Sequence, residues 1–279
     1  MNGALVGVVT DSAANVPPHL VRELGIEVVP MYLNLDGTAY RDGIDIAPGD
    51  FYRRLGSLRE PATTSSPSPG DFLDAFDRTG HRQIVCVTVA AEMSSTHRQA
   101  LRAAEAFDGT ATVIDSGSAS MGQGFPAVEA ARHARSGAGL EGVAARCREV
   151  LARIGLYATV DSFEFLRRSG RVNALQAYVA TALDIKPVFR FVRGRAEPVA
   201  RSRTRRRAVH RVVVECVQQA GARPVHVAAF HADAEQAAHE VVRSVREECQ
   251  VVEATVVEAT PVIGAHTGPG LVGAALYCD

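Results

Sequence analysis

The stretch "ALVGVVTDS", residues 4–12, predicts the class of the fold. Its first seven residues are almost all apolar, which is typical of a strand buried on both faces of a sheet. Thr10, Asp11 and Ser12 then supply polar groups where that strand ends. In an open α/β sheet, ligands bind at the carboxyl ends of the strands, where loops and helix N-termini present donors. We therefore expect an α/β protein with its site at this edge of the sheet.

The same alternation continues through the first half of the chain. Strands that alternate with helices predict an open, mostly parallel, Rossmann-like sheet. Further strands are expected at 26–35, 83–90 and 110–116, and helices at 17–25, 48–56, 69–78, 95–107, 119–135 and 140–153. We predict that residues 1–155 form an N-terminal α/β domain.

Residues 156–279 predict a smaller α/β domain with a mixed sheet. A hairpin is expected within 186–204, with "RGRA" at 193–196 as its turn. The other expected strands are 156–163, 225–232, 251–259 and 270–277, and the expected helices lie near 163–171, 172–183, 205–220 and 234–248.

Composition narrows the class of protein. The 279 residues are 47% hydrophobic and 22% charged, as in a folded globular protein of two ordinary domains. The formal net charge of −1 gives no electrostatic case for nucleic-acid binding. We recognise neither an export signal nor an apolar run long enough to span a membrane, so we expect a cytoplasmic protein. The five cysteines lack zinc-site spacing, which predicts reduced thiols and no metal.

Hydroxyl-rich stretches follow the strands or precede a helix at 10–12, 61–70, 92–96 and 114–120. Helix N-capping is the commonest use of such residues. For Ser94 and Ser118, capping and ligand contact both remain open. The four successive hydroxyls at 63–66 exceed what one cap requires, so we expect a ligand contact there.

His266 lies in "GAHTGPGLVG", residues 264–273, among glycines and directly before an apolar strand. From its surroundings alone it could be a metal ligand, a base, an anion donor or a histidine in a turn. It lacks cysteine, histidine or carboxylate companions at ligand spacing, which argues against a metal. Arg171 follows Ser-Gly at a predicted helix break, and its guanidinium suits phosphate or carboxylate.

The sequence contains none of the common catalytic motifs that we sought in a usable context. It has no P-loop, no GxSxG elbow and no HExxH. A GxGxxG pattern at 268–273 leads into a strand instead of opening a helix, so it does not indicate a dinucleotide site. A stand-alone hydrolase or phosphotransferase that uses Asp11, Asp115 and His266 stays as an alternative.

Taken together, seven of these stretches give the chain a resemblance to the DegV family of bacterial fatty-acid-binding proteins. They are "VTDSAANVP" (9–17), "TTSSPSPGDF" (63–72), "MSSTHRQA" (93–100), "VIDSGSASMGQG" (113–124), "LRRSGRV" (166–172), "KPVFRFVRGRAEPVARSRTRRRA" (186–208) and "GAHTGPGLVG" (264–273). Their order and intervals cover essentially the whole chain.

The resemblance implies two α/β domains with one long-chain fatty acid buried between them. It assigns the carboxylate contacts to the hydroxyl-rich loop, to the segment after the third strand and to the C-terminal histidine motif. The residues that match are Thr64, Ser65, Ser94, His266 and Thr267. The family usually has paired serines where this chain has Ala90 and Ala91, so one hydroxyl contact is expected to be missing. A binder of another amphipathic acid is therefore a further alternative.

The resemblance also implies a role in fatty acid activation. Such proteins present the acyl carboxylate to a separate ATP-binding subunit, the fatty acid kinase, and the acyl phosphate then serves phospholipid synthesis. Arg171 and Arg203 match positions that face the partner or the phosphoryl group. On this basis we expect a lipid-binding protein with no catalytic residues and no cofactor, and the resemblance allows transient contact with a membrane.

Overall fold

A computed structural model describes residues 6–171 and 185–279. Their strands form a four-stranded, a six-stranded and a three-stranded sheet. The start of the first predicted strand, at 4–5, and the helix predicted at 172–183 lie outside the described residues. Within the described residues, no helix is both long and apolar enough to cross a membrane.

The four-stranded sheet is parallel throughout, which confirms the predicted parallel sheet, and its strand order is β2-β1-β6-β7. Its strands are β1 (Gly7–Asp11), β2 (Ile26–Val29), β6 (Gln83–Thr88) and β7 (Thr110–Asp115). The α-helices around it are α1 (Pro18–Leu24), α3 (Pro69–Arg78), α4 (Thr96–Ala106), α5 (Met121–Arg135) and α6 (Leu140–Arg153), and a 3-10 turn, η1 (Ser12–Ala14), follows β1. One face packs against α3 and α4, and the other packs against α1, α5 and α6.

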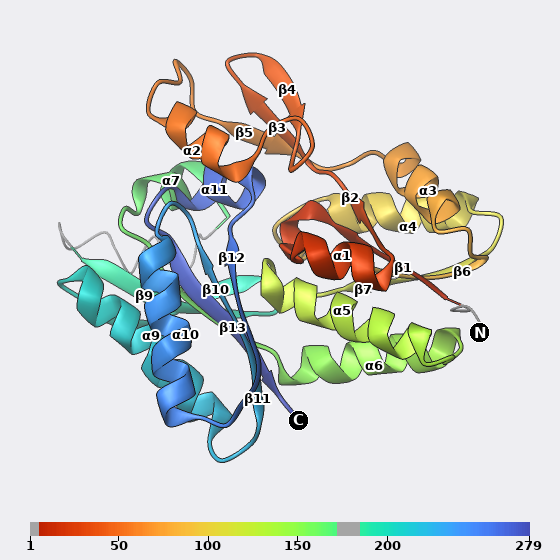
Figure 1. Cartoon of the computed structure of the whole chain (residues 1–279). Helices are drawn as coiled ribbons and strands as arrows, with labels where there is room; N and C mark the ends of the chain where they lie inside the picture. The colour runs from red at the N-terminus through yellow and green to blue at the C-terminus, as the bar shows by residue number, and fades with distance from the viewer. Residues whose placement is uncertain (1–5, 172–184) are drawn as a thin grey trace.

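Helix α5 belongs to two cores at once. It is buried at 12 of its 15 positions, because other elements pack against it on more than one side. Ala127 and Ala131 pack toward the four-stranded sheet, whereas Met121 and Phe125 belong to the core of the six-stranded sheet. Helices α5 and α6 therefore form the layer that the two sheets share (Figure 1).

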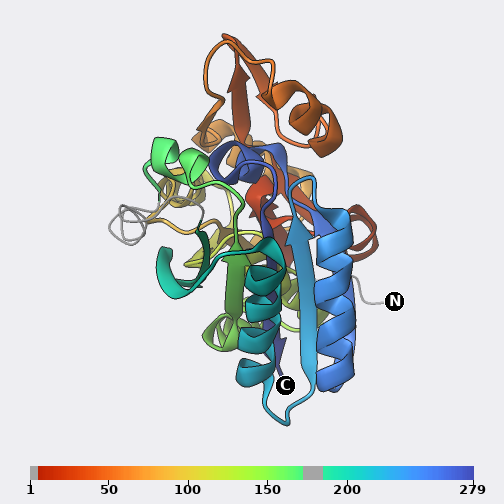
Figure 2. The ribbon, with the colours of Figure 1, turned by 90° about the vertical axis from the view of Figure 1, so that its left-hand side faces the viewer.

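The six-stranded sheet is mixed, in the order β10-β9-β8-β13-β11-β12. Its strands are β8 (Gly155–Thr159), β9 (Lys186–Val192), β10 (Arg195–Ser202), β11 (Val225–His231), β12 (Val251–Glu258) and β13 (Val272–Cys278), and its helices are α7 (Glu164–Ser169), α9 (Arg205–Ala220), α10 (Glu235–Glu248) and α11 (Pro261–Thr267). Helices α9 and α10 cover its outer face (Figure 2). Side chains alternate between the two faces along β13. Ala274 and Leu276 pack in the core under α9 and α10, whereas Ala275 and Tyr277 pack in the core on the opposite, inner face.

The β9–β10 hairpin has its turn inside the predicted "RGRA". Arg193 and Gly194 both have positive φ, of 49° and 77°, as a two-residue hairpin turn of the common mirror-image type requires. All strands of the six-stranded sheet begin at Gly155 or later. The division of the chain into two domains at residue 155 stays a prediction.

The three-stranded sheet was not predicted. The single strand expected at 26–35 is wrong, because the chain leaves the parallel sheet at Pro30, which cannot donate to a strand ladder. It continues as β3 (Tyr32–Leu35), which pairs in antiparallel fashion with β4 (Thr38–Arg41) and β5 (Thr63–Ser65), and α2 (Pro48–Leu55) lies between the last two. This small sheet lies above α7 and α11 in Figure 1, so it brings the hydroxyls near residue 64 toward α11.

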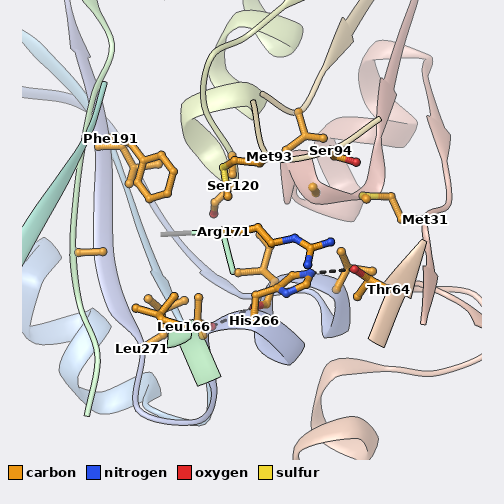
Figure 3. Close-up of a pocket in the computed structure, with 18 of the residues that line it drawn as sticks. Met31, Thr64, Met93, Ser94, Ser120, Leu166, Arg171, Phe191, His266 and Leu271 are labelled. Atoms are coloured by element: carbon orange, nitrogen blue, oxygen red, sulfur yellow. Dashed lines mark hydrogen bonds between the residues drawn. The ribbon is translucent and has the colours of Figure 1, made fainter. Parts of the chain in front are cut away.

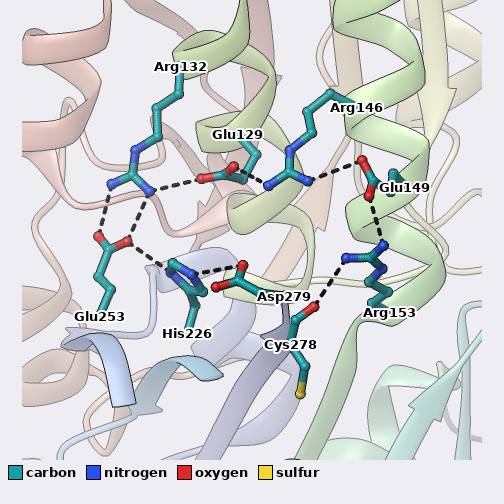
Figure 4. A network of polar contacts seen from close by, with 9 residues as sticks. All are labelled: Glu129, Arg132, Arg146, Glu149, Arg153, His226, Glu253, Cys278 and Asp279. Atoms are coloured by element: carbon teal, nitrogen blue, oxygen red, sulfur yellow. Dashed lines mark hydrogen bonds and ion pairs between the residues drawn. The ribbon is translucent and has the colours of Figure 1, made fainter. Parts of the chain in front are cut away.

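A charged network joins α5 and α6 to the inner side of the six-stranded sheet (Figure 4). Arg132 lies 2.9 Å from both Glu129 and Glu253, and Arg146 lies 2.7 Å from Glu129. The network comprises Glu129 and Arg132 of α5, Arg146, Glu149 and Arg153 of α6, His226 of β11, Glu253 of β12, and Cys278 and Asp279 at the end of the chain.

Candidate functional site

A cavity of about 380 Å³ lies between the two larger sheets. Its wall combines loops at the carboxyl ends of β1, β6 and β7 with β8, β9, β11 and α11, which agrees with a site at that edge of the parallel sheet. One part is apolar and is lined by Leu156, Ala158, Leu166, Phe189, Phe191, Phe230 and Leu271. The polar part is lined by Thr64, Ser65, Ser66, Ser94, Ser95, Arg171, His266 and Thr267 (Figure 3).

His266 lies in the last turn of α11, a helix that we had not predicted. Pro261 occupies the first turn of α11, where its missing N–H costs nothing, and Asp42 accepts a hydrogen bond from the Val262 N–H at 3.2 Å. This arrangement places the His266 Nε2 atom 2.7 Å from the Thr64 Oγ1 atom. The hydroxyl-rich loop and the C-terminal motif therefore meet at one point in the polar part.

The glycines around His266 allow close packing of α11 against its neighbours. A methyl group on Gly264 would lie 2.5 Å from the Tyr52 hydroxyl, which is too close for any real contact. A methyl group on Gly268 would lie 2.3 Å from the Phe165 ring, and the φ of Gly268 is +72°. At these two positions the nearest neighbours of the glycines are therefore side chains of α2 and α7.

His266 is held in its neutral form. Burial, and secondarily the positive charge of Arg171, lower the pKa of its imidazole to about 4. A neutral imidazole donates from one ring nitrogen and accepts at the other, so the Thr64 hydroxyl can serve as either partner. The polar part of the cavity therefore offers neutral donors to an incoming group, with one guanidinium beside them (Figure 3).

The serines of the polar part pair mainly with other hydroxyls. Ser66 Oγ lies 2.8 Å from Ser95 Oγ, and Ser94 Oγ lies 2.8 Å from Thr96 Oγ1. The N-cap of α3 is Ser68, so the hydroxyls at 63–66 are not needed for capping. All five predicted carboxylate contacts line the cavity, and Ser66 and Ser95 were missed although they lie in the stretches that we had selected.

Ala90 and Ala91 do not line the cavity. Ala90 is fully buried under the β9–β10 hairpin, where a methyl group on Gly194 would lie 3.0 Å from its Cβ. Ala91 is exposed, and its N–H donates to Asp115 at 3.0 Å. Positions 90 and 91 therefore lie outside the described lining of the cavity, and the alternative of a different amphipathic acid stays a prediction.

The two arginines differ in position. Arg171 follows Gly170, the left-handed cap of α7, and lies beside His266 at the cavity (Figure 3). Arg203 is exposed in the connection from β10 to α9, and the described lining of the cavity does not include it. The structure thus brings Arg171 but not Arg203 to the polar part.

The three residues of the hydrolase alternative do not form a site among the described residues that line the cavity. The Asp11 carboxylate is fully buried and accepts from the N–H groups of Ala13 at 3.0 Å and Val89 at 2.7 Å. Asp115 accepts from the Ala91 and Gly117 N–H groups. Neither carboxylate reaches the cavity that His266 lines. Within the described parts of the chain, no three histidine, cysteine or acidic side chains are grouped as metal ligands.

Comparison with known proteins identifies the family. The sequence model described as "Uncharacterised protein, DegV family" matches residues 5–279. A DegV domain-containing protein of Streptomyces coelicolor is 34% identical over 96% of each chain. Another, from Mycobacterium tuberculosis, is 34% identical over 96% of this chain and 95% of its own.

The solved structures agree. A DegV family protein from Thermus thermophilus, described as fatty acid binding, has a TM-score of 0.92 at 31% identity and covers 98% of this chain and 99% of its own. A DegV lipid-binding protein from Thermotoga maritima has a TM-score of 0.89 at 25% identity, and the cover is 98% of each chain. With its parallel sheet, its mixed sheet and the matched motifs over nearly the whole length, this chain belongs to the DegV family.

Proposed function

We propose that the cavity binds one long-chain fatty acid, with its carboxylate at Thr64, Ser94 and His266 and its tail among the aromatic and aliphatic residues of the apolar part. The single observation that carries this proposal is a cavity whose hydroxyls and imidazole gather in one part while the other part is apolar (Figure 3). That division matches the chemistry of an amphipathic acid.

The energetics favour such a ligand. Burial of roughly fifteen methylenes at about 0.8 kcal/mol each supplies roughly 12 kcal/mol before the costs of immobilisation. A carboxylate that leaves water needs hydrogen-bond donors in return. The hydroxyls of Thr64 and Ser94, with an imidazole N–H, are suited to donate to it. The Thermus thermophilus relative that is described as fatty acid binding supports the proposal.

We further propose that the protein presents this carboxylate to a separate ATP-binding subunit, a fatty acid kinase, for conversion to an acyl phosphate. A second, polar hollow of about 360 Å³ shares Thr64, Arg171 and His266 with the cavity. Arg59 and Arg168 also line that hollow, so an approaching anion would meet positive charge there. These features support access to the head group from the side away from the tail. The five free cysteines, four of them buried, fit work in the cytoplasm.

The first experiment is extraction of the purified protein followed by mass spectrometry of the lipids, together with titration of delipidated protein with palmitic acid. We expect a stoichiometric fatty acid and saturable binding. Empty protein that also fails to bind palmitic acid would overturn the proposal. For the finer role, ATP, palmitic acid and a bacterial fatty acid kinase subunit should yield acyl phosphate only when this protein is added.

A further inference from the structure

Ser120 has a backbone conformation that serine seldom adopts. It caps the N-terminus of α5 with φ 49° and ψ −146°, a region that is occupied almost only by glycine. The residue is also buried, with 2% of its surface exposed. A serine at such a position requires an explanation, because glycine would adopt the same backbone without strain.

The surrounding backbone fixes this conformation. The Ser120 N–H donates to the Ala13 carbonyl at 2.7 Å. Its carbonyl accepts from the N–H groups of Gln123 and Gly124, each at 2.9 Å. These three hydrogen bonds use only the main chain, so they account for the strained backbone but not for the hydroxyl.

The hydroxyl itself has no partner among the described residues. Ser120 Oγ is buried and makes no hydrogen bond within the described parts of the chain, and Ser120 is one of the residues that line the cavity. Two apolar residues of the wall adjoin it: Ala13, whose carbonyl accepts the Ser120 N–H, and Ala119, which precedes it in the chain. In Figure 3 it lies apart from the Thr64–His266 pair. The cavity therefore carries one hydroxyl on a part of its wall where a plain hydrocarbon tail would leave it unpaired.

We propose that the preferred ligand is a hydroxylated long-chain fatty acid whose chain hydroxyl pairs with Ser120 Oγ. This inference rests on the proposed fatty acid binding and specifies its substrate class. An unsubstituted tail leaves the buried Ser120 hydroxyl unpaired, whereas a chain oxygen within hydrogen-bond distance satisfies it. Strain and an unpaired buried donor at the same residue then have a common purpose in ligand selection.

The test compares wild-type protein with Ser120→Ala and Ser120→Gly, after delipidation, in binding to stearic acid and to a series of monohydroxystearic acids. For wild type we expect one isomer, or a few with adjacent hydroxyl positions, to bind about tenfold more tightly than stearic acid. Ser120→Ala should lose that advantage and bind stearic acid at least as tightly as wild type. Ser120→Gly should also lose it and melt at a higher temperature, because the backbone strain is relieved.

Ser118→Ala is the matched control. Ser118 Oγ is likewise buried and unpaired among the described residues, but Ser118 is not part of the described lining of the cavity. Its removal should leave the ranking of the acids unchanged. The proposal is overturned if wild type prefers stearic acid to every isomer, if Ser120→Ala keeps the preference, or if Ser120→Ala weakens stearic acid itself. Failure of wild type to bind any of the acids would instead overturn the proposed function.

Discussion

The charged network and the cavity both lie where the N-terminal half meets the six-stranded sheet, and they treat polar groups in opposite ways. In the network, Glu129 binds two arginines and Arg132 binds two carboxylates. In the cavity, Thr64 pairs with His266, other hydroxyls pair with one another, and Ser120 has no partner in the described residues. Groups that satisfy one another hold the structure together, whereas an unpaired hydroxyl of a residue that lines a cavity is available to a ligand.

The two regions also set charge differently. His226 and Arg132 lower the pKa of Glu253 to about 2, so the network keeps its carboxylate ionised. In the cavity, burial and Arg171 lower the pKa of His266 to about 4, so its imidazole stays neutral. A ligand can take over the hydrogen bond of a neutral group at a lower free-energy cost than it could break an ion pair inside the protein.

Replacement of His266 by alanine should produce the largest effect. We expect palmitic acid to bind about 10- to 100-fold more weakly, because a hydrogen bond to a charged group is lost. The melting temperature should change little, since the partner of His266 is the neutral Thr64 hydroxyl. Fluorescence displacement measures the affinity, and His239→Ala, at an exposed histidine on α10, is the control. If His266→Ala binds palmitic acid as tightly as wild type, the polar part of the cavity does not bind the carboxylate.

Replacement of Glu129 by glutamine should lower stability and leave ligand affinity nearly unchanged, the reverse of His266→Ala. Its carboxylate side chain is only 11% exposed and accepts from both Arg132 and Arg146. We expect a loss of about 1–2 kcal/mol in the free energy of unfolding, because two charge-assisted hydrogen bonds weaken. Palmitic acid affinity should stay within about threefold.

Urea unfolding measures the stability of this variant, and Glu149→Gln is the control. The Glu149 side chain is 44% exposed, so Glu149→Gln should lower the free energy of unfolding by about 0.5 kcal/mol or less. A Glu129→Gln protein of normal stability but weakened binding would show that the network serves the ligand.

The pH dependence of stability sharpens the contrast in charge. His266 has a folded pKa of about 4, below its ordinary value of 6.5, so the unfolded chain takes up its proton first as the pH falls. The stability that His266 contributes is complete above about pH 6.5 and is lost as the pH falls toward 4. Between pH 7 and pH 5, we expect the free energy of unfolding of His266→Asn to fall by about 2 kcal/mol less than that of wild type.

The comparison with His266→Asn isolates this histidine from other titrating groups. Burial raises the pKa of Asp11 and of Asp42 to about 6, and a hydrogen bond with Glu253 raises the pKa of His226. Those groups are present in both proteins, so their contributions cancel in the difference. Urea denaturation at pH 7, 6 and 5 gives the values, and parallel curves for the two proteins would contradict a neutral His266 in the folded state.

Sequence could identify the members of the site but not their surroundings. Thr64 and His266 were found because hydroxyl clusters and an isolated histidine stand out in local sequence. Helix α11 was missed because its valine, isoleucine and glycine disfavour a helix locally, and only packing against Tyr52 and Phe165 explains those glycines. The strain and the unpaired hydroxyl of Ser120 are properties of the folded chain. No local pattern could have revealed them.

The smallest expected effect concerns a hydroxyl placed just outside the lining of the cavity. Ala90→Ser introduces the hydroxyl that the family resemblance leads us to expect, at a position buried against the β9–β10 hairpin and outside the described lining of the cavity. We expect palmitic acid affinity to change less than about twofold, whereas Ser94→Ala, which removes a hydroxyl from the polar part, should weaken it about 3- to 10-fold. Isothermal titration of both variants gives the numbers. A gain from Ala90→Ser would mean that the wall of the binding region extends under the hairpin, and equal behaviour of the two variants would mean that lining the cavity does not decide which hydroxyls bind the acid.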